Sequence, residues 1–168
     1  MSYNYLPLDK NPTNFQQIKN LLAHEQMVSI TFDAHDRITK CRQYLDEKMK
    51  HSDALFYGIN TGFGYLQNVQ IDKAQLQQLQ LNLIQSHACG IGEEVPKDIV
   101  KLMIAFKIKS LSYGHSGVQT DTVERLMDMY NNDVLPVKYT QGSPGASGDL
   151  APPRPLSLPL DGFGEVYQ

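Results

Sequence analysis

The chain reads Gly-Ser-Pro-Gly-Ala-Ser-Gly-Asp-Leu-Ala-Pro from Gly142 to Pro152, and no other segment carries as much chemical information. Gly148 has no Cβ, so its amide nitrogen can fold back and attack the carbonyl carbon of Ala146. Loss of water closes a five-membered imidazolone ring, and loss of the Ser147 hydroxyl leaves an exocyclic methylidene. Such a ring is an electron sink that no ordinary side chain offers. The composition alone also fits a plain turn that leads into a helix.

Two earlier segments favour the chemical interpretation. One reads Phe-Tyr-Gly-Ile-Asn-Thr-Gly-Phe-Gly from Phe56 to Gly64, and the other reads Ser-His-Ala-Cys-Gly from Ser86 to Gly90. With Gly-Ala-Ser-Gly-Asp-Leu-Ala-Pro, they resemble the aromatic amino acid lyases, and within that family the histidine ammonia-lyase branch. The three motifs occur in the order that the family shows, and the likeness runs from about Tyr57 to Gly164.

The resemblance implies elimination of ammonia from an aromatic amino acid. It implies a 4-methylidene-imidazol-5-one formed from Ala146, Ser147 and Gly148, with no metal, and Tyr57 as the base that removes the β-proton. The substrate would be captured through its amine or through its ring, and the sequence does not decide between these. For L-histidine the products are urocanate and ammonia.

Tyr57 is singled out from nine tyrosines only by its motif. A phenolate needs nearby positive charge or hydrogen-bond donors to be stable, so the site must supply them. The alternative is a half-buried tyrosine whose hydroxyl caps a loop. Asn60 and Gly64, with Gly62, are expected to shape the loop that holds Tyr57 against the substrate, and such loops act as lids.

His87 follows Ser86 at the end of a predicted helix. In the family this position lies in the substrate pocket, and the Ser-His pair resembles the histidine-specific members. The alternative is a histidine that caps helix carbonyls or lies in the core. Asp149 either relays protons during ring formation or caps the following helix. The five histidines show no spacing of a metal site, so we expect no metal.

Size and composition predict a single domain over residues 1–168. A net charge of −3 offers no basic face for nucleic acid, and no apolar run is long enough to span a membrane. Two cysteines are too few for a disulfide framework, and the N-terminus lacks a signal-peptide core. We therefore expect a cytoplasmic protein whose partner is a small amino acid.

Hydrophobic periodicity and capping residues predict a mainly α fold with a short strand and a glycine-rich active-site loop. The helix expected from Pro96 onward runs through the apolar residues Ile99, Met103, Phe106 and Leu111. The expected elements are helices over residues 14–25, 33–50, 72–87, 96–111 and 121–131, a strand over 28–32 and a loop over 56–69, with Asp33, Asp72 and Asp121 at helix starts.

The family's chains are longer, and this chain is expected to be their N-terminal portion without the central helical bundle. That bundle supplies the arginine for the substrate carboxylate and the core of a tetramer, so we expect a homo-oligomer or a complementing fragment. Pro153 and Pro155 depart from the family's pattern after the triplet, as does Pro144 before it. Because proline disrupts helices, a catalytically inactive fragment that assembles through exposed helices is the alternative function.

Overall fold

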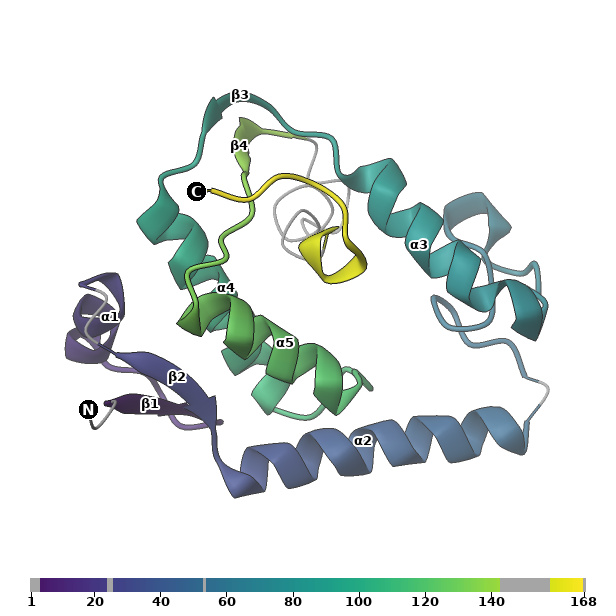
Figure 1. Cartoon of the computed structure of the whole chain (residues 1–168). Helices are drawn as coiled ribbons and strands as arrows, with labels where there is room; N and C mark the ends of the chain where they lie inside the picture. Colours follow the sequence, from purple (N-terminus) through teal and green to yellow (C-terminus); the bar gives the residue numbers. More distant parts are fainter. Residues whose placement is uncertain (1–3, 24–25, 53, 143–157, 168) are drawn as a thin grey trace.

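The computed structural model describes residues 4–23, 26–52, 54–142 and 158–167 (Figure 1). Five α-helices, four short strands and three short 3-10 turns follow one another in these ranges. They are β1 Tyr5–Leu8, α1 Phe15–Leu22, β2 Met27–Ile30, α2 Phe32–Lys50, the turns Gly64–Leu66 and Lys73–Gln75, α3 Leu76–His87, β3 Ile91–Glu94, α4 Lys97–Ser112, α5 Thr120–Asn131, β4 Tyr139–Gln141 and the turn Leu158–Asp161. The prediction of a mainly helical chain is confirmed.

The strands form two separate pairs. β1 lies parallel to β2, with Tyr5 opposite Met27 and Leu8 opposite Ile30. β3 pairs antiparallel with β4, and the register shifts between Ile91 and Glu94. The sequence predicted only the strand near β2, because four-residue segments show little periodicity and Pro7 argues against a strand unless it lies at an edge.

Helix starts follow local capping chemistry, with small corrections. The helix expected from residue 14 begins at Phe15 and ends at Leu22, and Asn14 is its cap, through a capping box with Gln17. The cap of α2 is Thr31, whose hydroxyl accepts from the Ala34 amide, and Asp33 instead lies in the first turn. The Thr31 hydroxyl and the Asp33 carboxylate are both side chains that can cap a helix. Thr31 is the cap because it follows the end of β2 and has the extended backbone conformation that a cap needs.

The apolar residues expected on α4 are only partly those of the core. Leu111 is buried and Met103 packs against the core, whereas Ile99 and Phe106 are exposed. The fully buried residues of α4 include Val100, Ile104 and Ile108. Both sets follow helical spacing, so periodicity alone did not distinguish them. Contact of α4 with α1, α2, α5 and β1 selects the buried face.

The core lies where α4 and α5 meet the β1–β2 pair and the first turns of α2. Its buried members are Leu6, Leu8, Leu21, Val28, Ile38, Val100, Ile104, Ala105, Ile108, Leu111, Val123, Leu126, Met129, Tyr130 and Leu135. Asn131, the last residue of α5, ties this core to β2. Its Oδ1 accepts from the Val28 amide at 2.8 Å, and its Nδ2 donates to the Val28 carbonyl at 3.0 Å. The side-chain amide of Asn131 thus makes the two hydrogen bonds to Val28 that a residue of a neighbouring strand would make.

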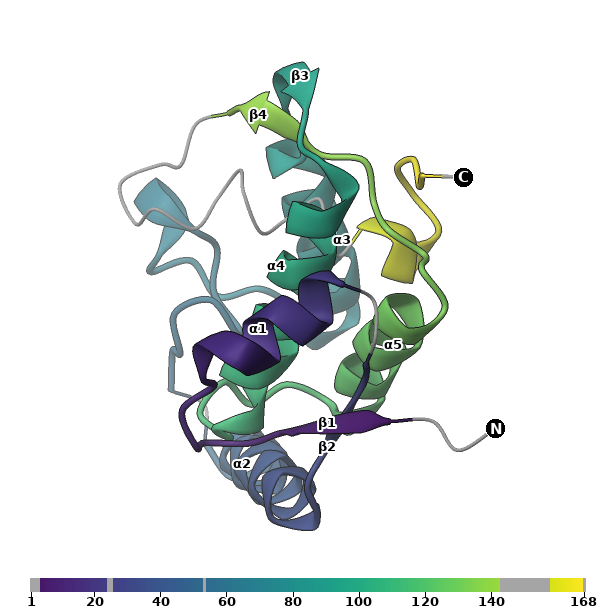
Figure 2. The ribbon, with the colours of Figure 1, turned by 90° about the vertical axis from the view of Figure 1, so that its left-hand side faces the viewer.

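Two arginines of α2 attach it to the segment between α4 and α5. Arg37 donates from Nε and Nη2 to the Ser112 carbonyl at 3.3 and 3.1 Å, and Arg42 donates to the Gly117 carbonyl at 3.3 Å. Gly114 lies against the backbone of Arg37 with a φ of +72°. These contacts fix the direction of α2 below the core, as Figures 1 and 2 show.

α3 and the loop before it lie outside this core (Figure 1). Between Phe63 and Ile99 no side chain that the structure describes is fully buried. The glutamines of this segment are exposed: Gln75, Gln77, Gln78, Gln80 and Gln85. Asp72 accepts from the Ala74 amide and begins the turn that continues into α3.

Candidate active site

The predicted ring-forming residues Ala146, Ser147 and Gly148 lie outside the residues that the structure describes, as do Asp149, Pro144, Pro153 and Pro155. The nearest described positions on either side are Gly142 and Leu158. Gly142 follows β4, and Leu158 begins the last 3-10 turn.

Tyr57 lies on the glycine-rich loop and is 63% exposed. Its hydroxyl oxygen accepts a hydrogen bond from the Gly64 amide at 3.4 Å, and its ring meets Phe63 edge to face at 5.9 Å between centroids. Gly64 has a φ of +56°, which a residue with a Cβ adopts only at a cost. This backbone conformation directs the Gly64 N–H toward the phenol, so the loop supplies a donor to Tyr57.

Asn60 holds this loop together from inside. Its side chain is buried, its Oδ1 accepts from the Phe56 amide at 2.7 Å, and its Nδ2 donates to the Ala54 carbonyl at 2.9 Å. Both ends of the amide are therefore used within the loop. Gly62 is needed for a different reason, because a Cβ there would lie 2.6 Å from that of Leu66.

α3 connects the Tyr57 loop to the Ser-His motif. Gln80, on α3, donates from Nε2 to the Gly58 carbonyl at 3.4 Å. His87 is the last residue of the same helix, about 10 Å further along its axis. The Ser86 hydroxyl donates to the Leu83 carbonyl at 3.2 Å, while the side chain of His87 is outside the described part.

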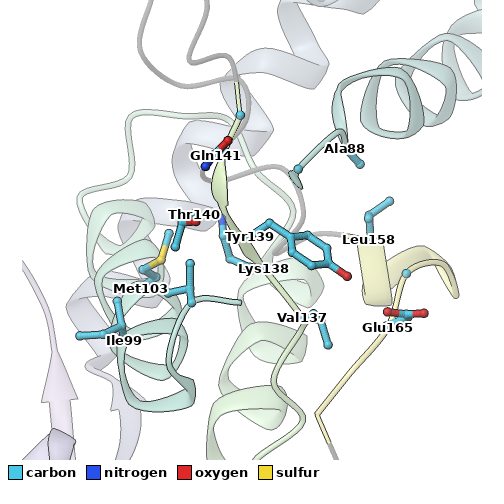
Figure 3. A pocket seen from close by; sticks show the side chains of 14 residues that line it. Ala88, Ile99, Met103, Val137, Lys138, Tyr139, Thr140, Gln141, Leu158 and Glu165 are labelled. Carbon is cyan, nitrogen blue, oxygen red and sulfur yellow. The ribbon is translucent and has the colours of Figure 1, made fainter. Parts of the chain in front are cut away.

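A cavity of about 520 Å³ opens beyond the end of α3 (Figure 3). Ala88 and Gly90, of the Ser-His motif, line one side, and Gly142 and Leu158 line another. The described ends of two of the three motifs therefore border one cavity. Tyr57 does not line it.

Lys138 lines this cavity too, and the sequence analysis did not select it. It is only 3% exposed, and its Nζ has no hydrogen-bond partner among the residues that the structure describes. Burial lowers the pKa of the Lys138 ammonium from 10.5 to about 8. The sequence offered one indication of a buried lysine, because Lys138 directly follows the apolar residues Leu135-Pro136-Val137. These neighbours do not by themselves show that the amine is buried.

A second, wider hollow of about 1160 Å³ lies between α2, the Tyr57 loop and the start of α5. Arg42 and Asp46 pair across one turn of α2 at 2.7 Å on its wall, and the hydrogen bond from Arg42 lowers the pKa of Asp46. Gly58 and Gln80 line the opposite wall, so this hollow reaches the base of the Tyr57 loop.

In the described ranges, no three histidine, cysteine, aspartate or glutamate side chains are grouped to hold a metal ion. Within the same ranges, no helix combines the length and the apolar character needed to cross a membrane.

The sequence profile of the aromatic amino acid lyases matches residues 13–168. The chain belongs to this family. Histidine ammonia-lyase of Deinococcus radiodurans is 47% identical over 156 residues, which are 92% of this chain and 30% of that protein. The enzyme of the same name from Staphylococcus saprophyticus is 41% identical over 96% of this chain and 32% of its own length. The chain thus spans about a third of these aromatic amino acid lyases.

Solved structures of the family share this fold. The histidine ammonia-lyase of Trypanosoma cruzi matches with a TM-score of 0.85 and 30% identity, over 98% of this chain and 31% of that chain. Tyrosine aminomutase of Streptomyces globisporus matches with a TM-score of 0.87 and 27% identity, over 97% and 31%. The predicted resemblance to the aromatic amino acid lyases is therefore confirmed.

Proposed function

We propose that this chain carries part of the active site of an ammonia-lyase that converts L-histidine to urocanate. The observation that carries the proposal is the 47% identity to a protein named histidine ammonia-lyase. The Ser86-His87 pair, at the end of α3 beside the cavity, supports an imidazole-containing substrate.

In this proposal Tyr57 removes the β-proton of the amino acid. The Gly64 amide donates a hydrogen bond to the Tyr57 oxygen and so helps to orient the phenol. Asn60 and Gly64 act on substrate binding through the loop, since one holds its ends and the other its turn. His87 contacts the substrate, and Ser86 supports the end of the helix that presents it.

The residues for a self-made electrophile are present in the sequence. Gly148 supplies an amide nitrogen without a neighbouring Cβ, Ala146 supplies the carbonyl carbon, and Ser147 supplies the hydroxyl that leaves. Such an imidazolone would supply an electron sink for the elimination of ammonia. Asp149 either takes part in proton transfer during this ring formation or caps the helix that follows.

Intact mass spectrometry of the purified chain tests the ring directly. Closure and dehydration remove two waters from Ala146–Gly148 and add an ultraviolet chromophore. Ser147→Ala is the matched control, because it has no hydroxyl to lose and cannot form the methylidene. The unmodified mass for the unsubstituted chain would contradict the proposed electrophile.

Turnover is then measured as urocanate absorbance with L-histidine, and with L-phenylalanine and L-tyrosine as competing substrates. Tyr57→Phe is expected to lower the rate by a factor of about 10² to 10⁴, with the ring mass retained. Faster elimination from phenylalanine than from histidine would overturn the assignment of the substrate.

A second candidate function is an inactive piece that assembles with other chains, as a homo-oligomer or as a complement to the rest of a lyase. The chain spans 30–32% of its curated relatives, and Phe32 is 96% exposed at the start of α2. Analytical ultracentrifugation, with the mass and activity measurements above, distinguishes the two candidate functions. A chain that associates, shows no turnover and has the unmodified mass supports the second candidate. Under both candidate functions, we propose that the protein is cytoplasmic.

A further inference from the structure

Tyr57 lies at the corner of a tight backbone turn. The Ile59 amide donates to the Phe56 carbonyl at 3.0 Å and closes this turn, and Gly58 occupies the third position with a φ of +76°. A φ of this kind is what a type II turn has at that position. The peptide that joins Gly58 to Ile59 thus has its N–H bonded inside the turn, whereas its carbonyl oxygen, on Gly58, has a partner from another element.

That partner comes from α3. Gln80 donates from Nε2 to the Gly58 carbonyl oxygen at 3.4 Å, and Figure 1 shows the Tyr57 loop beside this helix. Gln78, two residues earlier, donates instead to the Asn82 Oδ1 at 2.7 Å, on α3 itself. Of these two neighbouring glutamines, Gln80 bonds to the loop and Gln78 bonds within the helix.

The bond from Gln80 does little for the stability of the fold. The side chains of Gln80 and Gln78 are both exposed. An exposed hydrogen bond adds little to the free energy of unfolding, because water replaces either partner when the bond is lost. The contact with Gly58 therefore affects where the turn lies more than whether the chain folds.

The loop and this part of α3 are not held together by a packed core. Gly58, Ile59, Leu76 and Gln80 all line the second, wider hollow, so open space lies beside the contact. A glycine with positive φ has a wide choice of conformations, and packing does not restrict it here. The hydrogen bond from Gln80 is thus well placed to select one orientation of the turn.

The same helix carries the Ser-His motif. Position 87 follows Gln80 by seven residues, which is about two helical turns along the same face of α3. A bond that fixes the turn to α3 at Gln80 therefore also fixes the distance from the turn to the end of the helix, where Ser86 and His87 lie.

We propose that Gln80 is a positioning residue for Tyr57, and that its side-chain amide holds the turn at Gly58 in register with the helix that carries Ser86 and His87. This inference rests on the proposed function, in which Tyr57 removes the β-proton. Gln80 acts through the turn and not on the substrate. A displacement of about 1 Å in a reacting group can cost a factor of about 10² in rate, so a single weak bond is sufficient for this role.

Substitution at position 80 tests the need for a hydrogen-bond donor. Gln80→Glu keeps the shape but, as a carboxylate, has no N–H, whereas Gln80→Lys keeps a donor of similar reach. With L-histidine at pH 8 we expect Gln80→Glu to lower kcat by a factor of about 10 to 10², with KM changed by less than about twofold. Gln80→Lys should restore most of this loss. Gln78→Glu is the matched control and should leave both constants unchanged.

A double substitution shows whether Gln80 acts through Tyr57. In a Tyr57→Phe chain, adding Gln80→Glu should cause no further loss of kcat, because the hydroxyl that it positions is absent. A further loss as large as in the unsubstituted chain would overturn the proposal, as would an effect of Gln80→Glu on KM alone.

Amide hydrogen exchange, resolved by residue with NMR, tests the contact without any need for turnover. Gln80→Glu should lower the protection of the Ile59 amide by a factor of about 3 to 10, because the turn opens more often. Gln78→Glu should not change it. Unchanged Ile59 protection in Gln80→Glu would overturn the proposal. Lower Ile59 protection in a chain that shows no turnover would support the positioning of the turn and would count against the proposed function instead.

Discussion

At the scale of single residues, Asn60 has the clearest structural task near the predicted base. Its hydrogen bonds to Phe56 and Ala54 use both ends of its amide, and the side chain is buried. Asparagine is one of few side chains that can accept from one backbone group and donate to another in so short a space. The role of Asn60 in substrate binding is therefore expected to act through the loop.

Asn60→Ala should destabilise the folded chain by about 1–3 kcal/mol, because it leaves a buried donor and a buried acceptor without partners. Urea denaturation followed by circular dichroism measures the loss. Asn82→Ala is the control, since Asn82 is exposed on α3 and accepts only from Gln78. Equal effects of the two substitutions would show that the Asn60 bonds do not hold the loop.

Lys138 makes stability depend on pH. Its pKa is about 8 in the folded chain and near 10.5 when exposed, so between these values the unfolded chain binds more protons than the folded chain. Stability should therefore rise as pH increases from about 8 to 10.5. Below pH 8 the ammonium is present in both states, and the full cost of burying it remains.

Lys138→Met should consequently stabilise the chain at pH 7 by up to about 3 kcal/mol, and this gain should shrink toward zero near pH 10.5. Denaturant titrations at pH 7, 9 and 10.5, with Lys107→Met as the exposed control, measure it. A stabilisation that is the same at every pH would mean that packing of the methionine, and not the charge, is responsible.

At the scale of elements, the close approach of α2 to the end of α4 depends on Gly114. A Cβ at this position would lie 2.7 Å from the Arg37 Cβ and 2.8 Å from its carbonyl oxygen, and the φ of Gly114 is +72°. The Arg37 bonds to the Ser112 carbonyl require the same approach. The contact between α2 and α4 therefore needs a glycine for two separate reasons.

Gly162 allows these reasons to be separated. It has a φ of +76°, but a Cβ there would meet nothing within 4 Å. Gly162→Ala should cost about 1 kcal/mol through its backbone conformation alone, and Gly114→Ala at least about 2 kcal/mol more, because α2 must shift. Thermal unfolding of both variants measures the difference. If both lose the same amount, the backbone conformation alone explains the effect, and the close approach of α2 adds nothing.

At the scale of the whole molecule, burial is uneven. α4, α5, α1 and the β1–β2 pair share one core. Among the described residues, α3 contributes no fully buried side chain, and the Tyr57 loop buries only Asn60, Thr61 and Gly62. Local contact density sets the free energy of local opening. The candidate base Tyr57, the candidate substrate-binding residue His87 and its supporting neighbour Ser86 thus lie in or beside the less stable part.

Native-state hydrogen exchange should reveal this division. Amides of α4 and α5 are expected to exchange only through global unfolding, and amides of α3 through smaller openings with lower free energy. Mass spectrometry of peptides from residues 76–87 and 100–111 compares them, with denaturant added to separate local from global opening. Equal protection would instead support the prediction of one cooperative domain over residues 1–168, without a weaker part.

Local sequence was sufficient for much of this protein. The order of the three motifs predicted the family, and a capping residue such as Asp72 marked a helix start, because a cap acts within three residues of its own position. Tyr57, Asn60 and Gly64 could be grouped for the same reason, since they share one short loop. The exposure of the α3 glutamines also follows from local polarity.

Tertiary packing decided the rest. Two faces of α4 have helical apolar spacing, and only contact with α1, α2, α5 and β1 selects Val100, Ile104 and Ile108 for the core. Ile99 and Met103 line the cavity, together with Lys138, β4 and Leu158. The burial of Lys138 depends on segments that are far apart in the sequence. The residues next to Lys138 in the sequence therefore do not predict that it is buried.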